Sequence, residues 1–424
     1  MKIVLAVAAY AAATMMSCAA NAATVTVGTS AALDAAIKAA SGGDIIRIAP
    51  GNYGDFEFRN VNPASAITIT SANSARPPVF AHLTVRDSSF LNFSRLTVSS
   101  PAPTAANPAL NATDLIHSHD VRFSAMIFQG VVGGGVANEA RGMRISQSSG
   151  ITVATSSFNE LSHAITTDGS SHMTITDNAF SGIRTDGIIA DGASASLIAR
   201  NRFSAFRPEA GDHPDAIQVF NNLTPTSTLT ITDNLMVGDD GGQMQGIFMT
   251  NNAGNRAQLD RINIIGNLMW GTMWNGIAAF DANRLTVTGN VLYSNADLDI
   301  GKTWVRLEDV STATVSGNIA GAFIYADVGT LTGSANTLLV ADVGALAAVG
   351  LWDATHAATR YAIAYDDTEV GSLAPEFAQS RASAFAVAGV PEPASWLTMI
   401  TGFLMTGAVS RRLQRARGRR IQPA

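Results

Sequence analysis

The sequence predicts an all-β protein folded as a parallel β-helix, a solenoid in which each repeat forms one coil of a stack. The first observation is a triplet of a polar, a small and an aliphatic residue that recurs at intervals of 22 to 30 residues. The polar members, called the polar column below, are Arg141, His163, Asp186, Asp215, Gln245 and Asn275. Short alternating runs rich in Ile, Val and Thr, bounded by Gly, Asn and Asp, are the expected strands.

A second column fixes the register of the coils. It consists of Ser156, Asn178, Asn201, Asn234, Asn267, Asn290 and Asn318. The polar column precedes it by 15 residues in four coils and by 19 and 22 in the other two, and Thr303 continues the same frame before Asn318. Asparagine suits bends because it tolerates left-handed backbone geometry, and stacked Asn side chains can hydrogen-bond between coils. The insertions predict enlarged loops on one face, often the binding face.

The N-terminal part predicts a cap for the first coil. Leu33, Ile37 and Ala40 lie on one stripe of a short helix, which ends before Gly42-Gly43 and is followed by a strand at 45–48. The run from Gly43 to Tyr53 resembles the opening of the pectate-lyase-like right-handed β-helix superfamily, in which such a helix caps the stack. The resemblance covers residues 24–335 and implies a right-handed parallel β-helix domain, assigned to 23–335.

The first 22 residues are predicted to be a secretory signal peptide. Lys2 precedes an apolar run, and Ala20-Asn21-Ala22 forms a small-residue cleavage site. Cys18 is the only cysteine, so cleavage after Ala22 leaves no thiol for a disulfide or a metal. A lipoprotein signal at Cys18 is the alternative, although the Leu usual before such a cysteine is missing.

The C-terminal segment 390–424 is predicted to be a sorting signal. Val390-Pro391-Glu392-Pro393 is followed by an apolar transmembrane helix at 394–409 and then by six arginines. This order resembles the PEP-CTERM signal of Gram-negative bacteria. The resemblance implies transient anchoring, processing by an exosortase, and export across the inner membrane to the surface or medium, in association with exopolysaccharide. A plain membrane anchor is the alternative. Residues 336–389 are interpreted as trailing strands and a linker.

The charge of the body excludes some partners. Without both end segments, 20 of the 27 basic and 32 of the 33 acidic residues remain, so the net charge is about −12. Nucleic acid is therefore not an expected partner. A polyanionic glycan is also repelled unless a cation or a local basic patch compensates.

The chemistry is expected where the repeat is least regular. The turn from Asn201 to Asp215 spans 14 residues, against 7 or 8 in the regular coils, and it delivers His213 beside the polar column. The predicted lateral patch contains His213, Asp215, Asp186, Gln218, Gln245 and His163. Loops at 221–228, 236–244 and 251–258 are expected to wall a groove suited to a long linear polymer. Arg141 and Asn275, at the regular ends of the column, are interpreted as scaffold.

A narrower resemblance involves the segment Asp212-His213-Pro214-Asp215. It is similar to the DPH[DE] motif of mannuronan C5-epimerases and related alginate-acting β-helix enzymes, with His and Pro exchanged. That resemblance implies that His213 is the catalytic acid/base and Asp186 an acidic partner. The Lys/Arg catalytic pattern of alginate and chondroitin lyases of this fold has no match here.

Removal of a C5 proton from a uronic acid requires a base and a group that neutralises the neighbouring carboxylate. His213 suits the first role, with Asp215, Asp186 and His163 as further catalytic candidates. Candidates for substrate binding are Gln218, Gln245, Arg184 and Arg207. Asp212, Asp239 and Asp240 are candidate ligands for calcium, the one cofactor considered.

The leading hypothesis is an exported uronan lyase or C5-epimerase acting on an acidic exopolysaccharide. A non-catalytic matrix protein that binds exopolysaccharide is the first alternative. A glycoside hydrolase using the paired carboxylates of Asp186 and Asp215 is the second. Trp270, Trp274 and Trp304 either stack on sugar rings or fill space beside the small-residue column.

Overall fold

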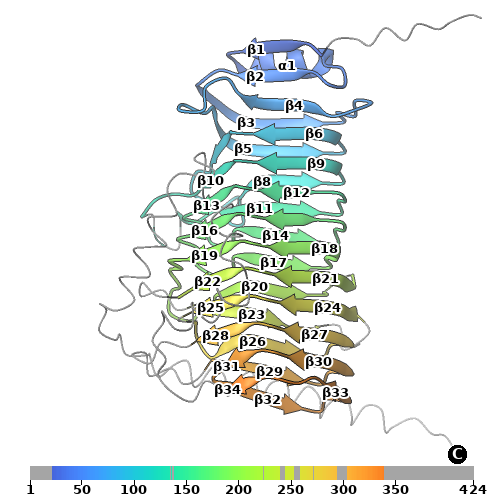
Figure 1. The fold of residues 1–424 in the computed structure, drawn as a ribbon. Coiled ribbons are helices and arrows are strands. Elements are labelled where there is room, and N and C mark those ends of the chain that lie inside the picture. The colour runs from blue at the N-terminus through green and yellow to red at the C-terminus, as the bar shows by residue number, and fades with distance from the viewer. Residues whose placement is uncertain are drawn as a thin grey trace, which may run out of the picture.

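The computed structural model describes residues 22–338, apart from 134, 136–137, 223, 239–243, 253–257, 271 and 294–302. Its strands stack in parallel, one coil above the next, with three strands in each regular coil (Figure 1). Corresponding strands of successive coils form three faces, called sheet 1, sheet 2 and sheet 3. The predicted parallel β-helix is thereby confirmed.

Sheet 1 consists of β1 (Thr24–Val27), β2 (Ile45–Ile48), β4 (Ile67–Ser71), β6 (Ser89–Ser94), β9 (His119–Ser124), β12 (Thr152–Ala154), β15 (Thr174–Thr176), β18 (Ser194–Ala199), β21 (Thr226–Thr232), β24 (Leu259–Ile265), β27 (Arg284–Thr288), β30 (Thr312–Ser316) and β33 (Thr330–Thr332). Sheet 2 consists of β3 (Asn52–Arg59), β5 (Val79–Arg86), β8 (Asn111–Ile116), β11 (Arg141–Ser146), β14 (Ile165–Asp168), β17 (Ile188–Asp191), β20 (Asp215–Phe220), β23 (Gln245–Met249), β26 (Asn275–Phe280), β29 (Trp304–Glu308) and β32 (Ala322–Ala326). Sheet 3 consists of β7 (Thr97–Ser99), β10 (Ile127–Gln129), β13 (Ser157–Asn159), β16 (Ala179–Ser181), β19 (Arg202–Ser204), β22 (Leu235–Val237), β25 (Leu268–Trp270), β28 (Val291–Tyr293), β31 (Ile319–Ala320) and β34 (Thr337–Leu338).

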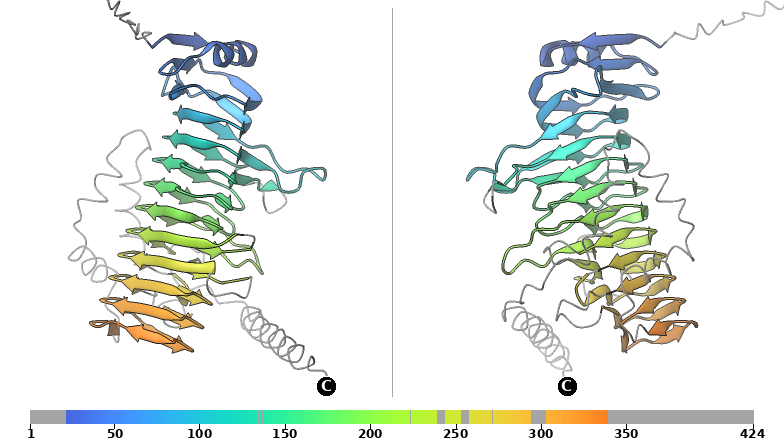
Figure 2. Two further views of the ribbon diagram at one scale, coloured as in Figure 1. Left: turned by 90° about the vertical axis from the view of Figure 1, so that its right-hand side faces the viewer. Right: turned by 60° about the vertical axis from the view of Figure 1, so that its left-hand side comes forward.

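The N-terminal end is capped by a helix, as the sequence predicts. Helix α1 (Ser30–Ala39) begins at Thr29, whose side chain accepts the N–H of Ala32, and it ends before Gly42. Leu33 and Ile37 are buried against the first strands. The helix lies beside β1 and β2 at one end of the stack (Figure 2). A polar outer face at the terminal repeat keeps the apolar end of a solenoid from solvent.

The polar column lies in register along sheet 2. Ile165 pairs with Ile188, Ile188 with Ile217, Ile217 with Ile247, and Ile247 with Ile277. The polar residues two positions earlier therefore stack from coil to coil. At the last step the register shifts, so that Asn275 pairs with Trp304. The expected frame through Thr303 holds at Val305, which pairs with Ile277, but the irregularity places Trp304 instead of Thr303 opposite Asn275.

The second column forms a buried asparagine ladder. From Asn178 to Asn318, each side-chain Nδ2 donates to the Oδ1 of the asparagine in the next coil at 2.9–3.0 Å. Backbone N–H groups of the same asparagines donate to the same oxygens. The ladder continues one coil beyond the prediction, to Asn336. It satisfies polar groups at bends that would otherwise be buried without partners.

The interior is filled by stacked apolar side chains. Phe128, Phe158, Phe180 and Phe203 lie in successive coils with ring centroids 4.5–5.0 Å apart and nearly parallel planes. Inward residues of all three sheets join them in one continuous core. Because each coil rests on this core, an insertion between strands can change a turn without moving the register of the neighbouring coils.

The small-residue positions next to the polar column are tightly enclosed. A Cβ on Gly246 would meet the carbonyl oxygen of Gly276 and would lie 2.6 Å from Sδ of Met269. We expect Gly246→Ala to lower the free energy of unfolding by about 1–3 kcal/mol, because a packed interior cannot accommodate the extra methyl. Chemical denaturation of Gly246→Ala beside Gly317→Ala tests this. Gly317 has a left-handed backbone but no heavy atom within 3.4 Å of its Cβ position. Equal losses would show that backbone strain, not close packing, determines the effect.

Two of the predicted loops need adjustment, and several predictions lie outside the described residues. β21 begins at Thr226, so the loop expected at 221–228 is shorter, because the β-rich run Thr226–Thr232 pairs with β18. β22 includes Met236 and Val237, so the loop expected at 236–244 begins later. The body of the signal peptide, most of 336–389 and all of 390–424 are outside the described part. No helix within that part is long and apolar enough to cross a membrane.

Candidate active site

The long turn of residues 205–214 connects β19 to β20 and carries His213 to the polar column. Its inner side is held by the buried Phe206 and by the N–H of Arg207, which donates to the carbonyl of Ile183. The N–H of Asp212 donates to the carbonyl of Glu209, and Oδ2 of Asp212 accepts the N–H of Glu209. These reciprocal bonds close a compact turn, so the position of His213 is determined by local backbone geometry.

His213 and Asp215 form a close pair. Nδ1 of His213 lies 3.2 Å from Oδ2 of Asp215, and Nε2 of Gln218 donates to the same oxygen at 3.2 Å. The imidazole side chain is 43% exposed, whereas the Asp215 side chain is fully buried. Oδ1 of Asp215 has no hydrogen-bond partner among the described residues. An exposed imidazole backed by a buried carboxylate is an arrangement typical of general acid–base catalysis.

Asp186 lies directly beside this pair in the neighbouring coil. Its Oδ1 accepts the backbone N–H of Asp215 at 3.1 Å, and its side chain is only 8% exposed. Burial, and then the nearby charge of Asp215, raise the pKa of Asp186 well above its ordinary value. Burial also raises the pKa of Asp215, while the contact with His213 opposes that shift. Because Asp215 accepts two side-chain donors, the negative charge is favoured on Asp215, and Asp186 is the more readily protonated of the two.

Opposing influences act on the imidazole of His213. Burial lowers its pKa, but the hydrogen bond and charge of Asp215, helped by Asp186, outweigh burial and raise the pKa overall. The group therefore changes charge at or above its ordinary range near neutrality, where an acid/base catalyst is useful.

The pKa of His163, one coil from Asp186, is lowered instead of raised. Burial, and then the charges of Arg141 and Arg184, lower its pKa to about 4. Its Nε2 is 3.6 Å from Oδ2 of Asp186, and its Nδ1 is 3.4 Å from the hydroxyl of Ser162. His163 is therefore neutral across the physiological range, which fits a structural position better than a proton-transfer role.

The low pKa of His163 predicts a loss of stability in acid. Between the ordinary value of 6.5 and about 4, the unfolded chain binds a proton that the folded chain does not. Stability therefore falls as the pH falls through that window, by up to about 3 kcal/mol from this group. We expect His163→Gln to flatten the stability profile between these pH values in urea titrations. A profile with the same slope as that of the unaltered protein would contradict the assignment.

The column continues from His213 through three further side chains. Nε2 of Gln245 contacts Nε2 of His213 at 2.9 Å, Nδ2 of Asn275 donates to Oε1 of Gln245 at 2.6 Å, and Nε1 of Trp304 donates to Oδ1 of Asn275 at 2.9 Å. Gln245 is 1% exposed. Of the predicted substrate contacts, Gln218 thus faces Asp215 and Gln245 faces His213. Asn275, interpreted as scaffold from the sequence, belongs to this chain.

The two predicted arginines are already paired. Nε of Arg184 is 3.1 Å from Oδ2 of Asp212, and its Nη1 is 3.6 Å from Oε2 of Glu139. Arg207 pairs with Glu160. These ion pairs connect the long turn to the turns of neighbouring coils. Their partners could not be read from the sequence, because the spacing within one coil does not reveal which turns touch.

The predicted calcium ligands are only partly described. Asp212 directs its carboxylate to Arg184 and to the N–H of Glu209. Asp239 and Asp240 lie outside the described residues. Within the described ranges, no group of three His, Asp or Glu side chains is placed to hold a metal ion. Calcium binding stays a prediction.

Arg141, interpreted as scaffold from the sequence, is an exposed arginine of the polar column, three coils from Asp215. Arg141 is exposed, and among the described residues its guanidinium has no carboxylate within 4 Å. It lies one coil beyond His163 in the polar column. Its position in the column was visible in the sequence, but its lack of a partner was not.

An aromatic strip on the outer side of sheet 2 was also missed. His213 contacts Phe248 edge to face with centroids 5.4 Å apart, and Phe248 lies 5.5 Å from Phe280. The guanidinium of Arg306 lies over Phe280 at 5.3 Å. Gln218, Phe248 and Arg306 occupy equivalent outward positions in the strand register, so period-two alternation was the signal that could have found the strip.

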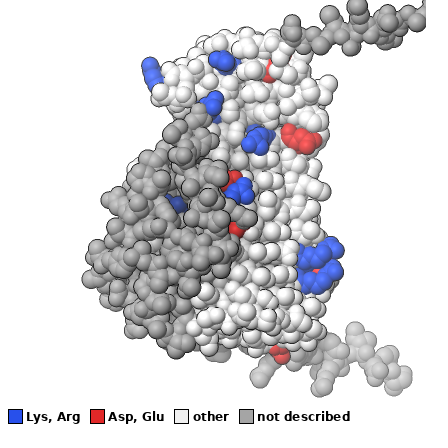
Figure 3. Space-filling model, in the orientation of Figure 1, with Lys and Arg blue, Asp and Glu red and all other residues white. Residues whose placement is uncertain are grey.

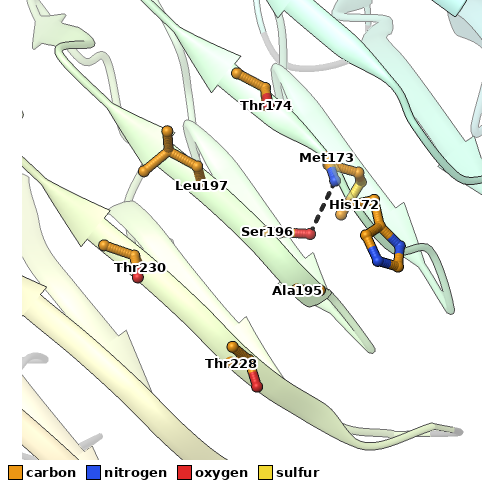
Figure 4. Close-up of a pocket in the computed structure, with 8 residues that line it drawn as sticks. All are labelled: His172, Met173, Thr174, Ala195, Ser196, Leu197, Thr228 and Thr230. Atoms are coloured by element: carbon orange, nitrogen blue, oxygen red, sulfur yellow. Dashed lines mark hydrogen bonds between the residues drawn. The ribbon is translucent and has the colours of Figure 1, made fainter. Parts of the chain in front are cut away.

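A separate hollow of about 490 Å³ lies on sheet 1. It is lined by side chains of β15, β18 and β21 together with His172 (Figure 4). In Figure 4, Ser196 accepts the backbone N–H of Met173, and the threonines Thr174, Thr228 and Thr230 lie along the strands. No residue of the His213 site lines it, and it contains no carboxylate.

Comparison with known proteins supports the fold. The family profile described as "Right handed beta helix region" matches residues 81–252. No curated protein matches the chain in sequence.

Solved structures extend the similarity beyond that region. The Dettilon tailspike protein gp208 has a TM-score of 0.54 at 12% identity, over 73% of this chain and 62% of its own. The GH136 lacto-N-biosidase from Eubacterium ramulus has a TM-score of 0.52 at 13% identity, over 74% of this chain and 67% of its own. The alginate lyase from Paenibacillus sp. str. FPU-7 has a TM-score of 0.45 at 17% identity, over 74% of this chain and 99% of its own. At these identities the likeness concerns the fold, and the chain is a right-handed parallel β-helix.

Proposed function

We propose that the protein acts on an acidic polysaccharide by removing the C5 proton of a uronic acid, as a lyase or a C5-epimerase. One observation carries the proposal: the exposed imidazole of His213 lies 3.2 Å from the fully buried carboxylate of Asp215. Tailspikes, a lacto-N-biosidase and an alginate lyase among the structural neighbours agree with a polysaccharide substrate by analogy of fold alone.

In the proposed proton transfer, His213 takes the proton and Asp215 then stabilises the charged imidazole. Nε2 of His213 takes the C5 proton, and the electron pair moves into the adjacent substrate carboxyl group as an enediolate. Asp215 accepts the Nδ1–H bond and stabilises the imidazolium that forms. Asp186 is nearly buried beside the pair, so the proton is returned by the imidazolium of His213 or by solvent water. Protonating the leaving oxygen would give β-elimination, and returning a proton to the opposite face of C5 would give the epimer.

Arg141 and the aromatic strip are proposed to bind the polymer. Arg141 supplies an exposed positive charge in the same column, which a polyanionic chain needs on a body of negative net charge. Phe248 and Phe280 offer apolar faces to sugar rings beside His213. On the face drawn in Figure 3, described charges of both signs are few and scattered.

The paired-carboxylate hydrolase has weaker support. That mechanism places both carboxyl groups at the scissile bond. Asp215 is fully buried and Asp186 nearly so. Neither carboxylate can take the position of a nucleophile or a water-activating base at a sugar without rearrangement of the turn.

Non-catalytic glycan binding is the second candidate, and a specific contact favours it. Buried Gln245 contacts Nε2 of His213 at 2.9 Å, so the nitrogen that would act as base is engaged in the free protein. A substrate C–H group must displace this amide for proton transfer to occur. If displacement never occurs, the same face can still bind a polymer through Arg141 and the phenylalanines.

Proton exchange at C5 separates the two candidates. The purified protein is incubated in deuterated buffer with polymannuronate, alginate or polygalacturonate, with calcium in one series and a chelator in the other. NMR then detects deuterium at C5 and unsaturated sugar ends. Exchange with unsaturated ends identifies a lyase, and exchange with inverted C5 identifies an epimerase. Binding of a uronan without exchange in either series would support the matrix protein. Export, exosortase processing and calcium dependence stay predictions.

A further inference from the structure

A directed chain of hydrogen bonds joins Trp304 to Asp215 through His213. Its four contacts measure 2.9, 2.6, 2.9 and 3.2 Å, in the order Trp304–Asn275, Asn275–Gln245, Gln245–His213 and His213–Asp215. The two ends are chemically unambiguous. An indole N–H can only donate, and an ionised carboxylate can only accept.

The donor-only indole determines the orientation of every later group. Because Trp304 donates, Asn275 must present Oδ1 to it and Nδ2 to Gln245. Gln245 must then present Oε1 to Asn275 and Nε2 to His213. Nε2 of His213 is therefore an acceptor, and the ring proton lies on Nδ1, where Asp215 accepts it. Both ends of the chain require the same arrangement.

We propose that Trp304 and Asn275 are positioning residues that hold His213 in its neutral form with the lone pair on Nε2. This is the form that a general base requires. The inference rests on the proposed function only for its catalytic consequence, since the arrangement of protons exists without substrate. The indole thus acts on His213 from the third coil along the stack.

Protonation of His213 would break the chain. The imidazolium has no acceptor, so Nε2–H would face the NH2 group of Gln245. Gln245 can turn its amide only if Asn275 also turns, and Asn275 would then face the indole N–H with its own NH2 group. The chain therefore opposes the cation, whereas Asp215 and, in its ionised form, Asp186 favour it; these are the carboxyl groups that face the ring among the described residues. The balance between them sets where His213 titrates.

Removing the indole donor tests the proposal without any substrate. The protein is labelled with ¹⁵N-histidine, and the signal of His213 is identified by its loss in His213→Ala. In Trp304→Phe the two amides are free to turn, so we expect the acid dissociation constant of His213 to fall about fivefold and its midpoint to move to higher pH. In Asn275→Asp the new carboxylate can only accept, so Gln245 must turn its NH2 group toward it and its oxygen toward His213. The midpoint of His213 should again move to higher pH. Trp274→Phe is the matched control, because its indole makes no hydrogen bond to a described residue.

Two outcomes overturn the inference: an unmoved midpoint in either folded variant, or a ring proton on Nε2 in the unaltered protein. If a uronan is turned over, the acidic limb of the kcat/KM profile should move to higher pH in Trp304→Phe, with the plateau retained. A purely structural role for Trp304 would lower the plateau without moving that limb. No turnover together with a shifted midpoint would reject the proposed function and leave the positioning role intact.

Discussion

Replacement of His213 by alanine is expected to lower kcat/KM for C5 exchange by about 10²–10⁴-fold, the range that a positioned acid/base residue contributes. Asp215→Asn should produce a loss of similar size while retaining the shape of the side chain. Its amide oxygen would still accept from Nδ1 of His213 and from Gln218, but the negative charge that stabilises the imidazolium is lost. Deuterium incorporation at C5, measured for both variants with the uronan that the unaltered protein turns over, provides the test.

The matched control for these variants is His172→Ala. His172 is exposed on sheet 1, beside the separate hollow, and far from the polar column in the strand order. It should retain full activity. Undiminished exchange in His213→Ala, with thermal unfolding unchanged, would remove the catalytic role from this imidazole and favour glycan binding.

Replacement of Asn267 by alanine is expected to produce the largest loss of stability, about 3–5 kcal/mol. The side chain of Asn267 accepts the N–H and Nδ2 of Asn234 and donates to Oδ1 of Asn290 and the carbonyl of Ile231. Asn267 and Asn234 are fully buried, so alanine leaves several polar groups without partners and without water. Each such group costs about 1–3 kcal/mol, although neighbouring groups can relax together.

Urea unfolding of Asn267→Ala and Asn263→Ala measures this effect. Asn263 lies on β24, just before the bend that carries Asn267, but it is half-buried, and its side chain makes one long bond of 3.4 Å to Thr230. We expect Asn263→Ala to change the free energy of unfolding by less than about 1 kcal/mol. A similar loss in both variants would mean that the asparagine ladder contributes no more than ordinary strand contacts.

The architecture was predictable because it repeats. In the polar column and in the asparagine column, the same position of the coil recurs in every repeat. One correct spacing therefore fixes the register of the whole stack. The helix at Ser30–Ala39 was equally readable from its apolar stripe and its stop before Gly42-Gly43. The register shift that places Trp304 opposite Asn275 could not be predicted, because a strand irregularity occurs once and leaves no periodic signal.

The site was predictable as a location but not as a set of contacts. The long turn before Asp215 identified His213 correctly as its neighbour. The pairing of Arg184 with Asp212 and Glu139 depends on contacts between turns of different coils, which have no fixed spacing in sequence. The absence of a carboxylate beside Arg141 among the described residues, and the role of Trp304, depend on side-chain direction. The sorting signal and Asp239-Asp240 remain predictions, since they lie outside the described residues.

The asparagine ladder has a consequence for the order in which the chain can acquire structure. Each amide receives its acceptor from the coil that follows it, 18 to 33 residues later in the chain. A stack that lacks its next coil therefore ends in asparagine N–H groups without acceptors. The next coil supplies these acceptors once it has been synthesised. Contacts between near neighbours in sequence favour rapid closure. The ladder makes this part of the stack a directional zipper, which begins at Asn178 and can close one coil at a time toward the C-terminus.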